Sequence, residues 1–162
     1  MGLFDWIKPR AKAPRDLASL AEFVESRAAF LVQKTIYEYS RARASVHSDT
    51  LFGEKAFVDA VNLSCWTSLP DGLVFEALMI EGHLRPLAGE DRLALVDGLV
   101  AVVDAVAARQ PTPEVLEAGF WAATRPEIAA RIRRGAAAAV KPVNEIPLAD
   151  LDGFFARLPI HE

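Results

Sequence analysis

Apolar residues recur every three or four positions along most of this chain, and strict alternation of apolar and polar residues is almost absent. The longest periodic segment runs from Asp16 to about His47 and contains neither proline nor glycine. Asp16 is a suitable N-cap, and a helix of this length would extend on the order of 45 Å at 1.5 Å per residue. The pattern therefore predicts an all-α protein organised around a long N-terminal helix.

The predicted helix has apolar residues on two faces. One face is an ordinary core stripe, made of Leu17, Leu20, Ala21, Val24, Ala28, Leu31, Thr35, Ala42 and Val46. On a different face, Phe23, Phe30 and Tyr37 repeat every seven residues. A helix with apolar surface in two directions is expected to lie between layers of the fold.

A third row of the same helix is cationic, and each cation follows an aromatic residue by four positions. The pairs are Phe23 with Arg27, Phe30 with Lys34, and Tyr37 with Arg41. Residues four apart are neighbours on a helix, so a cation can lie over the ring before it, which stabilises an exposed pair by roughly 0.5–1 kcal/mol. Two interpretations stay open. The row either binds an anionic partner (a phospholipid headgroup, an RNA or an acidic protein surface), or its cationic stems cover the margin of a buried face.

Further helices are predicted after the long one, separated by prolines and glycines. The expected ranges are 54–66, 72–85, 90–109, 113–124, 126–140 and 148–157. The segment from Leu69 to Gly72 contains Pro70 and is interpreted as a break, and Pro126 is expected to open a new helix. Residues 16–162 should therefore form a single-domain bundle of six or seven helices.

Residues 1–15 combine an apolar tip with a basic stretch. The apolar residues are Leu3, Phe4, Trp6 and Ile7, and the basic residues are Lys8, Arg10, Lys12 and Arg15. Pro9 and Pro14 prevent a continuous helix, so a flexible segment is expected. Its tip either settles into an anionic membrane surface or folds back over an edge of the core.

Composition narrows the class of protein. A chain of 162 residues with 52% hydrophobic and 25% charged residues is typical of a soluble globular domain. Its net charge of −4 argues against general nucleic-acid binding, which needs a dominant basic surface. The single Cys65 excludes an internal disulfide framework and a multi-cysteine metal site. Since no signal peptide and no apolar run of roughly 18 residues is found, we expect a cytoplasmic protein. If its tip is a membrane contact, and does not fold back over the core, that contact would be with the inner face of the membrane.

Catalytic and metal-binding motifs are missing from the sequence. It contains no G-x-S-x-G, no H-E-x-x-H, no glycine-rich phosphate loop and no Glu-x-x-His pattern of di-iron bundles. No catalytic residue, cofactor or metal ligand is therefore predicted. Cys65, Glu76 and His83 would form a dispersed enzyme site only if folding brought them together. The arginines between residues 120 and 134 give a generic likeness to a DNA-reading helix-turn-helix, which the acidic net charge opposes.

These patterns favour a non-enzymatic helical interaction protein of the adaptor or assembly-factor type. Its partner would be another protein, a second copy of the chain or an anionic membrane surface. The candidate binding residues are the aromatic and cationic pairs of the long helix and the N-terminal tip. Two alternatives remain. One is a helical carrier of an apolar, lipid-like ligand, whose charged end would meet Arg27, Lys34 or Arg41. The other is an enzyme with a dispersed site.

Overall fold

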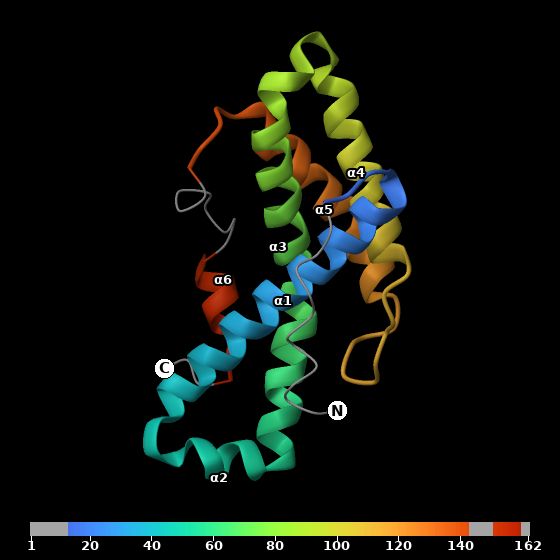
Figure 1. The fold of residues 1–162 in the computed structure, drawn as a ribbon. Helices are drawn as coiled ribbons and strands as arrows, with labels where there is room; N and C mark the ends of the chain where they lie inside the picture. Colours follow the sequence, from blue (N-terminus) through green and yellow to red (C-terminus); the bar gives the residue numbers. More distant parts are fainter. Residues whose placement is uncertain (1–12, 143–150, 160–162) are drawn as a thin grey trace.

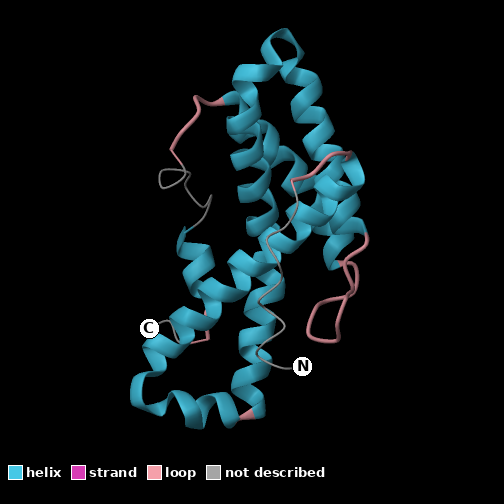
Figure 2. Cartoon of the chain, in the orientation of Figure 1, coloured by secondary structure: helices cyan, strands magenta, loops and turns pink. Residues whose placement is uncertain are grey.

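The computed structural model describes residues 13–142 and 151–159, and within these ranges the chain is helical and has no strand. Four helices of 17 residues or more form the body: α1 (Leu17–Ala44), α3 (Lys55–Ala88), α4 (Arg92–Ala108) and α5 (Phe120–Ala137). Two helices have six residues each, α2 (Ser48–Gly53) and α6 (Leu151–Ala156). The all-α prediction is confirmed (Figure 2). The predicted bundle of six or seven helices is not matched: in the described residues four long helices form the body, because neighbouring predicted helices are joined.

Helix α1 begins as its sequence predicts. The Asp16 carboxylate accepts a hydrogen bond from the Ser19 N–H at 2.8 Å, and the Ser19 hydroxyl accepts one from the Asp16 N–H at 3.2 Å. This reciprocal capping box satisfies two of the free N–H groups at the start of the helix. The regular helix ends at Ala44, and residues 45–47 continue it as a 3₁₀ turn. The predicted range of 16–47 thus covers the helix and its last turn.

The helix that packs against the most others is α3, not the predicted organising helix α1. It contacts α1, α2, α4 and α5, and α1 crosses it diagonally (Figure 1). The buried residues of α1 are Ala21, Val24, Ala28, Val32, Ile36, Ser40 and Ala44. A row with mostly four-residue spacing slants across the helix surface, as expected for helices that cross at an angle. The predicted core stripe is therefore correct only in part: Leu17 and Val46 are 70% and 86% exposed.

The predicted break around Pro70 does not occur, because α3 continues through it. Pro70 has no N–H to bond the carbonyl four residues earlier, which disfavours a helix interior. Pro70 and Gly72 are, however, both buried. A Cβ at Gly72 would lie 2.7 Å from Val32 Cγ2 and 3.1 Å from the carbonyl oxygen of Ala28. The glycine thus permits the close crossing of α1 and α3, and this packing overrides the local signal.

The predicted boundary at Pro126 is also wrong. Residues 113–119 form turns, and α5 starts after Gly119, whose φ of 83° favours glycine. Pro126 lies inside α5. The loop before α5 is held by Trp121, whose indole N–H donates to the carbonyl oxygen of Pro111 at 3.0 Å. This contact fixes the buried Trp121 in the first turn of α5. The helix therefore begins before Pro126, which lies in its interior.

Two clusters of buried residues lie on either side of the crossing. The first joins the start of α1 to the second half of α3 and to α4 and α5. The second joins the end of α1 to the first half of α3 and to Phe154 and Leu158 near the C-terminus. The last helix therefore closes its own bundle. The apolar tip with Leu3, Phe4, Trp6 and Ile7 lies outside the described residues. Among those described, no helix combines the length and apolar content that crossing a bilayer requires.

Candidate functional site

Two of the three predicted cation and aromatic pairs are formed on α1. The guanidinium carbon of Arg27 lies 5.4 Å from the ring centroid of Phe23, and Lys34 Nζ lies 5.8 Å from that of Phe30. Both cations are exposed, and Phe30 is 41% exposed. These distances are typical of cation–π pairs. Arg27 and Lys34 thus each lie beside the aromatic ring four residues earlier on α1, as predicted.

The third pair differs from the prediction, because α2 returns against the end of α1. Arg41 lies 5.9 Å from the ring centroid of Phe52, a residue of α2, instead of covering Tyr37. The Tyr37 ring stacks on the same Phe52 at 5.8 Å. Phe52 comes from another helix, so spacing within α1 could not identify it. We call the residues Phe23, Arg27, Phe30, Lys34, Tyr37 and Arg41 the α1 row.

Carboxylates accompany the cations of the α1 row. Lys34 forms an exposed ion pair with Glu38 at 3.7 Å. Glu76 of α3 faces Arg27: burial raises the pKa of the Glu76 carboxyl, and the nearby positive charge of Arg27 partly opposes this shift. The row is therefore a mixed pattern of charges, with cations and exposed ring surface more prominent than anions.

The residues considered for a dispersed enzyme site do not converge. Cys65, Glu76 and His83 all lie on α3, and at 1.5 Å per residue they are separated along it by roughly 16 and 10 Å. Burial raises the pKa of the Cys65 thiol to about 12, so the thiol stays protonated at neutral pH. His83 is exposed. The described part of the chain has no group of three or more histidine, cysteine or acidic residues arranged to hold a metal ion.

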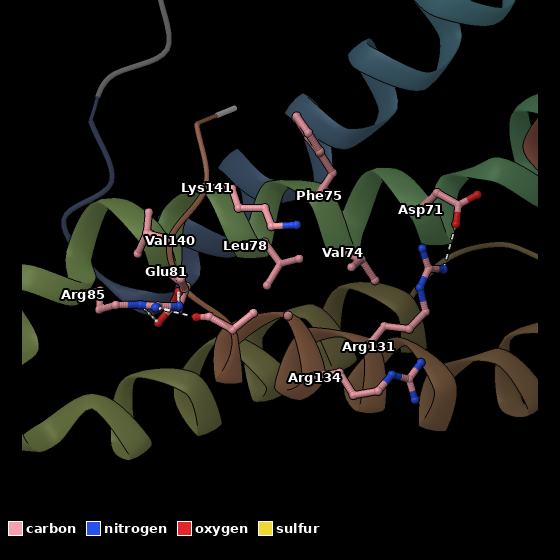
Figure 3. A pocket seen from close by; sticks show the side chains of 14 residues that line it. Asp71, Val74, Phe75, Leu78, Glu81, Arg85, Arg131, Arg134, Val140 and Lys141 are labelled. Carbon is pink, nitrogen blue, oxygen red and sulfur yellow. Dashed lines mark hydrogen bonds and ion pairs between the residues drawn. The ribbon is translucent and has the colours of Figure 1, made fainter. Parts of the chain in front are cut away.

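A pocket of about 280 Å³ lies between α3, α5 and the segment that follows α5 (Figure 3). Its apolar walls include Val74, Phe75, Leu78 and Val140. Its cationic residues are Arg85, Arg131, Arg134 and Lys141, and its carboxylates are Asp71 and Glu81. None of the α1 row lines it. The ligand site of a carrier that used Arg27, Lys34 or Arg41 would therefore not be this pocket.

Buried Glu81 anchors one end of the pocket. The residue is only 1% exposed, and its carboxylate accepts hydrogen bonds from Arg85 Nε at 2.8 Å and Nη2 at 2.6 Å. Arg92 Nε lies 3.4 Å from the same carboxylate. Arg85 also donates to the carbonyl oxygens of Ala136 and Ala138, and Arg92 donates to that of Ala136. The cluster thus satisfies carbonyls at the C-terminal end of α5 and joins it to α3.

Asp71 anchors the opposite end of the pocket. Its carboxylate pairs with Arg131 of α5 at 2.7 Å and with Arg157 at 2.5 Å. Ser64 of α3 also donates a hydrogen bond to the carbonyl oxygen of Arg157. The residue predicted to lie in a break therefore connects α3 to α5 and to the C-terminal segment.

The arginines of α5 are mostly engaged with acidic residues. Arg125 pairs with Asp104 of α4 at 2.7 and 2.5 Å, and Arg133 pairs with Asp97 at 3.1 Å. The hydrogen bonds from Arg125 lower the pKa of the Asp104 carboxyl. These contacts align α5 with α4 and explain the basic segment without a nucleic acid.

Comparison of the chain with family models, curated proteins and solved structures finds no match.

Proposed function

We propose that this protein is a non-enzymatic helical interaction protein, of the adaptor or assembly-factor type, whose α1 row binds an acidic helix of a partner protein. The supporting observation is a set of three exposed cations along one side of α1, each near an aromatic ring of α1 or α2. The cations are seven residues apart. A seven-residue repeat on a straight helix drifts only slightly around its axis, so a helix lying along α1 would meet one cation per heptad.

The aromatic rings prepare the cations for binding. A guanidinium or ammonium held over a ring has fewer conformations to lose when a carboxylate approaches, which lowers the entropic cost of association. The exposed part of Phe30 adds apolar surface between Arg27 and Lys34. Charge complementarity would then set the register and speed the encounter more than it would raise affinity.

The mixed charges favour a protein partner over a membrane or a nucleic acid. Glu38 lies beside Lys34, and Glu76 lies near Arg27. A continuous anionic surface would be repelled by both carboxylates, whereas a helix can place its acidic residues only opposite the cations. The net charge of −4 also argues against a nucleic-acid partner, because few counterions would be released from the nucleic acid on binding.

A photo-crosslinking residue at Phe30 tests this function in cells of the source organism. We expect an adduct with one protein, through a helical segment whose acidic residues repeat every seven positions. Val115, which is 40% exposed on the loop before α5, is the matched control position, and it should give no such adduct. Equal labelling from both positions would contradict the proposal.

Charge substitution sharpens the same test. Changing Arg27, Lys34 and Arg41 together to Gln should abolish the adduct while leaving the melting temperature nearly unchanged, because exposed cations contribute little to stability. The control variant replaces three other exposed cations, Lys55, Arg109 and Arg133, with Gln. An adduct that survives the first substitution would refute the role of the row. Cosedimentation with phosphatidylglycerol vesicles that depends on the same three cations would assign the row to a membrane instead.

A further inference from the structure

We propose that the pocket between α3 and α5 binds a small amphipathic carboxylate, with its chain against Leu78 and Val74 and its head group at Lys141. This site is separate from the α1 row and does not depend on the function proposed for it. Its volume of about 280 Å³ is close to the lower limit of ordinary small-molecule sites. The pocket therefore suits a short or medium alkyl chain better than a whole phospholipid.

The apolar part of the pocket lies where two helices come close together. A Cβ at Gly135 would lie 2.7 Å from the terminal methyl groups of Leu78, so the glycine lets α5 approach α3. Val140, from the segment after α5, also lines the pocket, with its Cγ1 3.4 Å from where a Cβ of Gly82 on α3 would lie, and it is 52% exposed. An alkyl chain between Leu78 and Val140 would remove apolar surface from water, which is worth roughly 25 cal/mol per Å².

The charged part of the pocket has an excess of cations. Both lining carboxylates are already held by arginines: Asp71 by Arg131 and Arg157, and Glu81 by Arg85 and Arg92. Each carboxylate therefore faces two positive charges, which leaves a positive potential at both ends of the pocket. Such a potential disfavours a cation and favours an anion.

Lys141 is the cation best placed to meet the anion. It lines the pocket, and no ion pair is found for it among residues 13–142 and 151–159. In Figure 3 its side chain extends along α3, with its ammonium drawn near the Leu78 and Phe75 side chains that form the apolar wall. One ammonium beside an apolar wall, without an ion pair in the part of the chain that the structure describes, matches one carboxylate on an alkyl chain. Arg134 also lines the pocket, forms an exposed pair with Glu127 at 2.7 Å, and adds to the positive potential.

Isothermal titration calorimetry with octanoate, and with octanol as its neutral counterpart, tests this site. We expect octanoate to bind the full-length protein with one site, and Lys141→Gln to weaken that binding by up to about fivefold, as the loss of one exposed ion pair would. Octanol should bind more weakly than octanoate and be insensitive to Lys141→Gln. Arg133→Gln is the matched control, because Arg133 neighbours Arg134 on α5 but does not line the pocket.

A second variant tests the position of the alkyl chain. Ala139 is an exposed lining residue outside the helices, so Ala139→Trp should fill the mouth without disturbing the buried clusters. It should abolish octanoate binding and leave the melting temperature unchanged. The site would be refuted if wild-type protein bound no octanoate at millimolar concentration, if Ala139→Trp bound it normally, or if octanol bound as tightly as octanoate.

Discussion

The two longest helices, α1 and α3, use their charged residues in opposite ways. The cations of α1 are exposed and lie beside aromatic rings of α1 and α2. Asp71 and Glu81 of α3 point inward, and each is bound by two arginines, among them residues of α4, α5 and the C-terminal segment. The inward carboxylates of α3 connect helices and stabilise the fold. The exposed cations of the α1 row contribute little to stability, so they are available for binding.

Replacing Glu81 with Ala should have the largest effect on stability. The substitution leaves Arg85 and Arg92 without their buried carboxylate, and breaking such a cluster usually costs about 3–5 kcal/mol. Urea unfolding followed by circular dichroism measures the loss. Glu127→Ala is the control, since its pair with Arg134 is 58% and 65% exposed, and it should cost less than about 1 kcal/mol. Similar losses in the two variants would mean that the inward charges of α3 do not hold the fold.

The crossing of α1 and α3 can be tested with two glycines. Gly72→Ala should destabilise the protein by about 1–3 kcal/mol, because the added methyl group would collide with Val32 and with the backbone of Ala28. Gly98→Ala, in the middle of α4, meets nothing within 4 Å and should stabilise by up to about 1 kcal/mol through helix propensity. Thermal melting of both variants and the wild type measures these two changes in stability. Stabilisation by Gly72→Ala would show that the two helices are further apart than described.

The same contrast explains which parts of the fold could be predicted. Helix α1 is specified by signals within its own sequence: the Asp16 cap and the absence of proline and glycine. Helix α3 contains Pro70 and Gly72, which in isolation favour a break. What keeps it helical is the packing of that region against α1, together with the contacts of Asp71 to α5 and the C-terminal segment. No local pattern contains this information, so the sequence predicts two helices where the structure has one.

The candidate sites follow the same rule. Arg27 and Lys34 could be paired with their rings because partners four residues apart share a helix face. Arg41 could not be paired with Phe52, since this contact depends on the path of α2. Arg85 is four residues after Glu81, a signal visible in the sequence, but the burial of the pair and the participation of Arg92 depend on tertiary structure. The pocket is not visible in the sequence either, because its walls come from separate segments.

Glu76 lies on α3, near the exposed cation Arg27 of α1. Among these variants, its substitution should change the free energy of unfolding least. Burial raises the pKa of its carboxyl above the ordinary value, and Arg27 opposes the shift. The folded state therefore holds the proton more tightly than the unfolded chain does. Stability from this group is fully present below the unfolded pKa and is lost as pH rises through the folded pKa.

Glu76→Gln removes this ionisation, so the variant should match the wild type at about pH 4 and be more stable by less than about 1 kcal/mol at about pH 7. Thermal melting of both proteins across this range measures the difference. In an Arg27→Gln background the gain from Glu76→Gln should increase, because the cation that opposes the shift is absent. If Glu76→Gln instead destabilised the protein at neutral pH, attraction to Arg27 would outweigh burial. Arg27 would then belong with the charges that hold the fold, and the α1 row would lose one of its three binding cations.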